Sequence, residues 1–389
     1  MKKIISLLLV LAMALALVAC GSSQSAETQT TAAPAETKAS EATEAPADTK
    51  KHEGVELTMW SMWTAGEAQA QVIQAAADAF EADTGAHVNI EWKGRDVNTL
   101  LSAALESGEK LDIFEDDYNR IGNAYAPYTY DLTEMADAAG YADFSYACFN
   151  NQSVAWAGYL NSIVEQPQIG GVFYNKDVFD ACNITKTPTT WAEFLTTCET
   201  LEANGYEALA LDGAYANFNF YYHLVRHLGE DGIKELGLNG GWAANEAAVA
   251  AARETIDLVN AGFLADGAPD AYPASQTKVG LGTAAMVVCA NYVTSEVDAA
   301  VGESVNWGFF NYPEVEGNVD ASAYAGANSL AISSSCENPQ AAFDFIMTIV
   351  TGTCGQELVD KGGQIPADTR LKESVLAGSV ETLKNTTTP

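Results

Sequence analysis

Residues able to hold a polar solute stand directly after three apolar segments of this sequence. Aromatic rings, carboxylates and amides are mixed there. Such a mixture suits a sugar, because its C–H faces stack on rings while its hydroxyls need planar acceptors and donors. For Trp63 the alternative role is packing, and for Asp116 it is a solvated acidic loop. The candidates are Trp63, Thr64, Glu67, Asp116, Tyr118, Asn291 and Tyr292.

The apolar segments before these residues predict strands. These segments are 55–60, 111–114 and 284–288. Residues 87–92 have the pattern of a further strand, and the helical patterns between 55–60, 87–92 and 111–114 end at Gly85 and Gly108. Strands that alternate with helices of this kind predict βαβ units and a parallel sheet. In open parallel sheets ligands bind beyond the carboxyl ends of the strands, which is where the candidates stand.

The stretch 171–194 has the clearest local structure signals in the chain. A strand, a turn and a short helix are followed by Pro188, which favours an extended entry to the next element. Thr190 and Glu193 then form the pattern of a capping box, which predicts the start of a longer helix. The expected role of this stretch is structural.

Length and charge limit what this chain can be. A chain of 389 residues exceeds one typical core and predicts two domains or one interleaved pair. The formal net charge of −33 repels nucleic acid and anionic lipid headgroups, so neither is expected as a partner.

The first residues have the pattern of an export signal. A positive start is followed by the apolar run 4–16, which is too short for a membrane span, and by small residues before Cys20. This resembles a bacterial lipoprotein signal, so we predict a signal peptide at 1–19 and a diacylated Cys20 (palmitate) anchored at the outer face of the cell membrane. An ordinary cleaved signal peptide is the alternative. Residues 20–53 then form the lipidated cysteine and a flexible tether.

Six further cysteines have no C-x-x-C or zinc-site spacing, and no metal or other cofactor is expected. Each stands among small apolar residues, which favours buried reduced thiols, with disulfides as the alternative for an exported chain. They are Cys148, Cys182, Cys198, Cys289, Cys336 and Cys354.

From Val55 to about Thr382 the chain resembles the family 1 extracellular solute-binding proteins of bacterial ABC importers, the group that includes maltose-binding proteins. Four signatures carry the resemblance in the right order. They are Tyr174-Asn175-Lys176-Asp177 with Pro188, Thr190-Trp191 and Glu193; Gly282 to Met286 with Asn291-Tyr292; Trp307-Gly308 to Pro313; and Gly326 to Ile332 with Asn338-Pro339 and Phe345.

The resemblance implies a periplasmic-binding-protein-like α/β fold. Two interleaved α/β lobes with central sheets would be joined by a hinge of several segments and would close over a solute. The N-terminal lobe would comprise 54–170 plus 303–320, and the C-terminal lobe 171–302 plus 321–389.

The resemblance also implies positions for ligand contacts. Gln168 lies six residues before Tyr174, where sugar-binding relatives carry a polar contact, and Tyr292 takes the place of a stacking aromatic residue. Trp156, near the expected lobe junction, is a further candidate. Asn328 stands where many relatives have tryptophan, and this departure argues against extensive stacking of a long oligosaccharide.

The implied function is capture of a carbohydrate, either a mono- or an oligosaccharide, for delivery to the membrane permease of an ABC importer. The binding protein would be a monomer that performs no reaction. No GxxxxGK[ST] motif is present, so the ATPase would be a separate chain. One alternative keeps the fold but binds a polyamine or other cation, because of the acidic run 115–117. A remoter alternative is a lipid-anchored glycosidase that uses Glu67 and Asp116.

Overall fold

The computed structural model describes residues 50–373 and 377–384. The predicted signal peptide, Cys20 and most of the predicted tether lie outside these residues. Within them, no helix is long and apolar enough to cross a membrane. The last residues of the predicted tether are bonded to the folded body, because the His52 amide donates to Thr84 O (2.8 Å) and its Nε2 lies 2.7 Å from Asp344 Oδ2.

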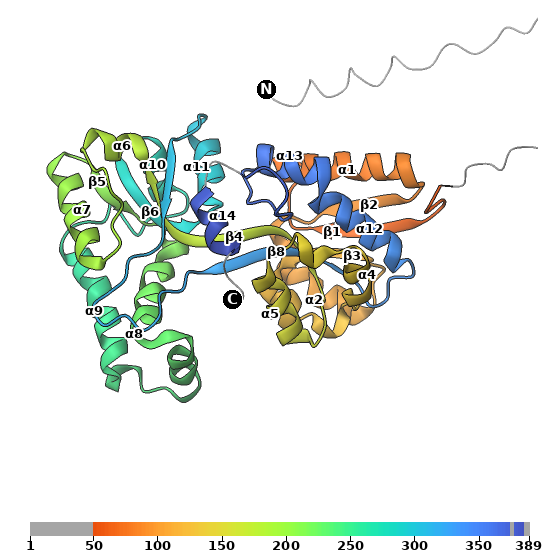
Figure 1. Cartoon of the computed structure of the whole chain (residues 1–389), viewed down its shortest axis with the longest axis horizontal. Coiled ribbons are helices and arrows are strands. Elements are labelled where there is room, and N and C mark those ends of the chain that lie inside the picture. The colour runs from red at the N-terminus through yellow and green to blue at the C-terminus, as the bar shows by residue number, and fades with distance from the viewer. Residues whose placement is uncertain (1–49, 374–376, 385–389) are drawn as a thin grey trace, which may run out of the picture. The chain divides into compact units, whose positions relative to one another are not determined.

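Eight strands form the sheet system, in the order β2-β1-β3-β8-β4-β6-β5, with β7 also paired to β4. Two long strands, β4 and β8, run side by side through the middle of the molecule (Figure 1). The strands are β1 (Glu56–Ser61), β2 (His87–Trp92), β3 (Ile113–Asp117), β4 (Ile163–Asn175), β5 (Glu207–Ala210), β6 (Ala284–Ala290), β7 (Trp307–Phe310) and β8 (Ala325–Ile332).

The predicted α/β fold is confirmed, with a mixed central sheet. The first three strands pair in parallel, as expected from their βαβ pattern. The returning strand β8 is antiparallel to both β3 and β4. The strand predicted at the start of 171–194 begins much earlier, at Ile163, because the burial of nearly all its residues outweighs the local signals of Pro167 and Gly170. A register irregularity between Val164 and Gln166 lies just before that proline.

Helices cover both faces of the N-terminal sheet. One face packs its apolar residues, such as Ile113 and Leu330, against α1 (Ala68–Thr84) and α12 (Pro339–Val350). The other face packs Phe114 and Ala331 against α2 (Val97–Ser107). The remaining helices of this part are α3 (Tyr118–Asn123), α4 (Thr133–Ala138), α5 (Ala147–Ala157) and α13 (Gly352–Gly362).

A second set of cores surrounds the C-terminal half of β4. Val172 packs with Phe194 and Leu209 on one face, and Phe173 packs with Val287 and Val293 on the other. The helices of this part are α6 (Lys176–Ala181), α7 (Trp191–Ala203), α8 (Ala216–Asn239), α9 (Glu246–Asn260), α10 (Ala274–Gly280) and α11 (Val293–Val301). The last helix of the described residues, α14 (Ala377–Lys384), begins after residue 376.

Helix α7 begins as the sequence predicts. The Thr190 hydroxyl accepts from the Glu193 amide (3.3 Å), and the Glu193 carboxylate accepts from the Thr190 amide (3.2 Å), which completes the capping box. Asn245 likewise accepts from the Ala248 amide at the start of α9 (3.0 Å). Helix α12 starts at Pro339, and the Asn338 side chain makes no capping bond there.

Candidate binding site

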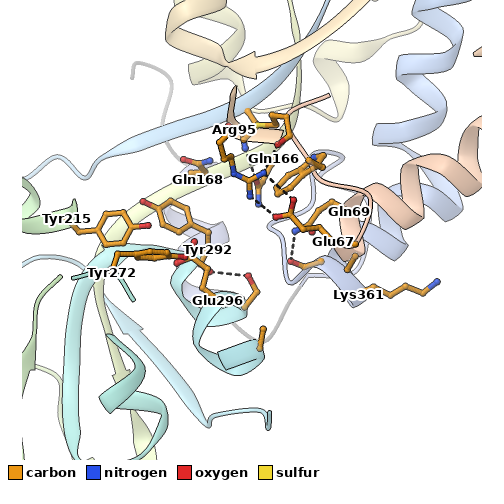
Figure 2. Close-up of a pocket in the computed structure, with 18 residues that line it drawn as sticks. Glu67, Gln69, Arg95, Gln166, Gln168, Tyr215, Tyr272, Tyr292, Glu296 and Lys361 are labelled. Atoms are coloured by element: carbon orange, nitrogen blue, oxygen red, sulfur yellow. Dashed lines mark hydrogen bonds and ion pairs between the residues drawn. The ribbon is translucent and has the colours of Figure 1, made fainter. Parts of the chain in front are cut away.

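A cavity of about 580 Å³ opens beside the two crossing strands β4 and β8. Three groups of side chains line it (Figure 2). The loop after β1, the start of α1 and the end of α13 form one wall, together with Arg95. Polar residues of β4 and β8 form the floor. The opposite wall comes from segments around β5, α10 and α11.

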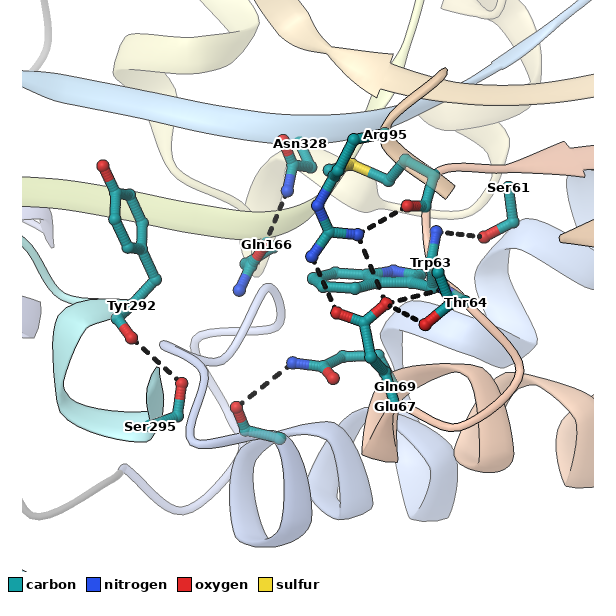
Figure 3. A network of polar contacts seen from close by, with 12 residues as sticks. Ser61, Trp63, Thr64, Glu67, Gln69, Arg95, Gln166, Tyr292, Ser295 and Asn328 are labelled. Atoms are coloured by element: carbon teal, nitrogen blue, oxygen red, sulfur yellow. Dashed lines mark hydrogen bonds and ion pairs between the residues drawn. The ribbon is translucent and has the colours of Figure 1, made fainter. Parts of the chain in front are cut away.

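An ion pair stacked on an indole forms the first wall. The Arg95 guanidinium lies over the Trp63 ring, with 4.9 Å between its central carbon and the ring centroid. Its Nη2 donates to Glu67 Oε1 (2.7 Å), and the Thr64 hydroxyl donates to Glu67 Oε2 (2.9 Å) (Figure 3). Burial alone would raise the pKa of Glu67, but hydrogen bonds from Thr64 and Arg95 and the guanidinium charge hold it below its ordinary value.

This wall contains two predicted residues and one that sequence reasoning missed. Trp63 and Glu67 line the cavity, whereas Thr64 does not line it and its hydroxyl is bonded to Glu67. Arg95 follows β2, so the rule that ligands bind beyond strand ends would have selected it had it been applied to that strand. Trp63 is only 4% exposed, so most of its ring is covered.

Amides form the floor. Gln166 and Asn328 face each other across β4 and β8, and Asn328 Nδ2 donates to Gln166 Oε1 (2.7 Å) (Figure 3). Gln168 lies two residues along the same strand and lines the cavity, because alternate residues of a strand share a face. Gln168 and Asn328 were predicted. Gln166 was missed, although the two-residue spacing from Gln168 was a usable signal.

Three tyrosines form the opposite wall. Tyr215 follows β5, Tyr272 precedes α10, and Tyr292 follows β6. The ring centroids of Tyr272 and Tyr292 lie 5.9 and 5.8 Å from that of Tyr215. Tyr292 was predicted. The other two were missed, because residues far apart in irregular segments carry no common sequence pattern. Glu296, one turn into α11, completes this wall.

Besides Thr64, four further predicted residues do not line the cavity. Asp116 is buried and accepts from Arg120 Nε (2.9 Å). Tyr118 and Trp156 pack on each other in a core cluster, with 5.0 Å between their ring centroids. Asn291 Oδ1 accepts from the Ile169 amide (2.9 Å) and so supports β4 instead. These four side chains make structural contacts, so they are not available to a solute in the cavity.

The acidic run 115–117 also turns away from the cavity. Asp117 caps α3, because it accepts from the amides of Asn119 (3.1 Å) and Arg120 (3.2 Å). Glu115 is fully buried and accepts from the Ser61 hydroxyl (2.6 Å). Burial raises its pKa to about 7, although the Ser61 bond opposes this shift. The expectation that this run faces a cationic solute therefore fails.

Among residues 50–373 and 377–384, no group of three or more His, Cys, Asp and Glu side chains is placed to hold a metal ion. The six cysteines in these residues are free thiols, and all but Cys354 are buried.

Residues 64–350 match the family model of the bacterial extracellular solute-binding proteins. The match covers well over half of the chain, so the chain belongs to this family. It is therefore a binding protein and not an enzyme. A comparison with curated protein sequences finds no match.

Solved structures share the fold. A chitin oligosaccharide binding protein is 20% identical, with a TM-score of 0.70 over 85% of this chain and 86% of that one. Maltose-bound MalE3 of T. maritima is 19% identical, with a TM-score of 0.66 over 85% and 86% of the two chains. A sugar transporter from Bacillus licheniformis in complex with stachyose is 17% identical, with a TM-score of 0.64 over 85% and 87%.

Proposed function

We propose that this protein captures a carbohydrate in the cavity beside β4 and β8 and delivers it to the permease of an ABC importer. One observation carries the proposal: tyrosine rings and planar amides line the same cavity. Rings offer faces to sugar C–H groups, while amides supply paired donors and acceptors for hydroxyls. The sugar-binding proteins named above add support, since they have the same fold.

The two sets of cores suggest how the cavity would close. The predicted bounds, 54–170 plus 303–320 and 171–302 plus 321–389, need one correction, because Trp307 and Phe310 pack in the C-terminal cores while α12 and α13 pack with α1. The N-terminal lobe would therefore comprise β1 to β3 with α12 and α13, and the other lobe would hold β5 to β7. Strands β4 and β8 would cross between them. Each wall of the cavity would belong to a different lobe, so a solute that touches both walls stabilises the closed form. A lipid on Cys20 would keep the protein at the outer face of the membrane, near its permease.

The geometry does not favour the glycosidase alternative. It requires two carboxylates across one sugar site, but Asp116 is buried and paired with Arg120. The other candidate, Glu67, is paired with Arg95 and hydrogen-bonded by Thr64. A carboxylate held in this way is a weak base and is not available to protonate a leaving group.

A thermal-shift panel of mono- and oligosaccharides tests the carbohydrate proposal. The protein should first be unfolded and refolded so that any solute carried from the cell is removed. A sugar at a hundredfold excess over its Kd should add about 2.7 kcal/mol to the free energy of unfolding. No shift with any glycan would overturn the proposal. Release of reducing sugar from a bound oligosaccharide would instead favour the glycosidase.

A further inference from the structure

Tyr215, Tyr272, Tyr292 and Glu296, here called the tyrosine wall, bring three aromatic rings and a carboxylate to one side of the cavity. The Tyr215 and Tyr272 rings meet nearly edge to face, at 85°, so they present surfaces in different directions (Figure 2). Aromatic faces attract cations because the ring quadrupole is negative above and below its plane. A carboxylate beside such faces strengthens this attraction.

Glu296 has no cationic partner among the described residues. None of the ion pairs formed within residues 50–373 and 377–384 includes it. Its Oε2 accepts from Gln276 Nε2 (3.0 Å). Burial raises the pKa of Glu296, although hydrogen bonds from Gln276 and Tyr272 and the more distant charge of Arg95 oppose the shift. A positive group in the cavity would therefore stabilise the ionised carboxylate.

The other charges that line the cavity are already compensated. Arg95 and Glu67 neutralise each other through the contact at 2.7 Å. Lys361 pairs with Glu357 (2.9 Å), and its side chain is 58% exposed. Glu296 is thus the lining carboxylate whose charge is left for a solute to balance. The floor contributes amides, which bind hydroxyls and carry no charge.

We propose that the tyrosine wall recognises a protonated amino group, so that the solute is an amino-bearing carbohydrate. The inference rests on the proposed function, because it assumes that the amides and rings bind a sugar. The ammonium would lie against the tyrosine faces and donate to the Glu296 carboxylate, while the sugar hydroxyls meet Gln166, Gln168 and Asn328. A free polyamine would satisfy the wall but would leave the floor amides without hydroxyl partners.

Titration calorimetry with matched sugars tests this proposal. Each set differs only at C2, which carries an amine, an acetamide or a hydroxyl, and the sets include gluco- and galacto-sugars as mono- and trisaccharides. We expect the amine to bind about tenfold tighter than its matched hydroxyl sugar. Glu296→Gln should reduce that preference to about twofold. Glu303→Gln is the control, because it removes an equal charge just after α11 at an exposed residue outside the cavity.

The possible outcomes separate the two proposals. If hydroxyl or acetamide sugars bind as tightly as the amines, the amino-group proposal is overturned while the carbohydrate proposal stands. If spermidine or putrescine binds and no sugar does, both are overturned. An amine preference that survives Glu296→Gln but disappears in Tyr215→Leu would assign recognition to the rings alone and overturn the role of the carboxylate. Far-UV circular dichroism of each variant establishes that it is folded.

Discussion

Arg95 lies over the indole of Trp63, with 4.9 Å between the guanidinium carbon and the ring centroid. Two residues earlier, Lys93 lies over Trp60 in the same manner, with its Nζ 3.9 Å from the ring centroid. Both cations also pair with a carboxylate, Glu67 for Arg95 and Glu91 for Lys93. The first stack lines the cavity and the second does not. The chain therefore contains one such stack at the cavity and a second, away from it, that serves as a natural control.

Replacing Arg95 with alanine should weaken solute binding by about tenfold, because a cation–π contact in a partly shielded site is worth about 1 kcal/mol and the Glu67 carboxylate loses its partner. Stability should change by less than about 1 kcal/mol, since the Arg95 side chain is 55% exposed. Calorimetry with the solute found in the glycan panel measures the first effect, and urea unfolding measures the second.

Lys93→Ala is the matched control for Arg95. It removes the second stack, so it should leave solute affinity within about twofold while lowering stability by a similar small amount. Equal affinities of wild type and Arg95→Ala would show that Arg95 only shapes the wall. In that case the stack would have no part in recognition.

Tyr292→Ala should cost about tenfold or more in affinity, because the solute loses a ring face. Tyr292→Phe keeps the face and should retain most of the affinity. If phenylalanine is as damaging as alanine, the hydroxyl and not the ring carries the contact. The same solute and calorimetric assay serve both variants, and thermal unfolding shows whether either is merely unstable.

The sequence predicts the fold better than the site, and particular residues show why. Thr190 and Glu193 act on each other within one turn, so their pattern determines the start of α7. Asp116 and Tyr118 stand at a strand end, where ligand contacts are expected. In the fold, however, Asp116 accepts a hydrogen bond from Arg120, and the Tyr118 ring packs against Phe149. Competition of this kind depends on tertiary packing, which a linear pattern does not contain.

The cavity-lining residues that were not predicted from the sequence fall into two groups, those with a local sequence signal and those without one. Gln166 and Arg95 obey rules of spacing and strand ends, and so they were accessible from the sequence. Tyr215 and Tyr272 come together only because a segment between β5 and α8 packs against the loop before α10. Contacts between irregular segments that are distant in the sequence arise only in the folded chain, so local sequence patterns do not predict them.

Thr190→Ala should lower the free energy of unfolding by about 1 kcal/mol, since the Glu193 amide loses its acceptor at the helix start. Solute affinity should be unchanged, because the capping box does not line the cavity. Urea unfolding with and without solute measures both. Thr196→Ala is the control within the same helix, and its exposed hydroxyl bonds only to Ala192 O. A loss of affinity in Thr190→Ala alone would show that this helix start affects the site.

The buried Glu115 predicts a pH dependence of stability. Its pKa is about 7 in the folded protein and near its ordinary value of 4.5 in the unfolded chain. Between these values the folded protein holds a proton that the unfolded chain has lost, so the free energy of unfolding falls as pH rises. Below pH 4.5 both forms hold the proton, and above pH 7 neither does. The loss should be on the order of 3 kcal/mol.

Glu115→Gln removes this titration while an amide still meets the Ser61 hydroxyl. The variant should be more stable than the wild type at pH 8 and no more stable at pH 4.5, as measured by urea unfolding across this range. Glu109→Gln, at an exposed position, should follow the wild-type profile. Glu165, also buried, has a pKa raised by burial and by the Glu115 charge. Some decline should therefore remain in the variant. Parallel profiles for wild type and Glu115→Gln would show that Glu115 stays ionised in the fold.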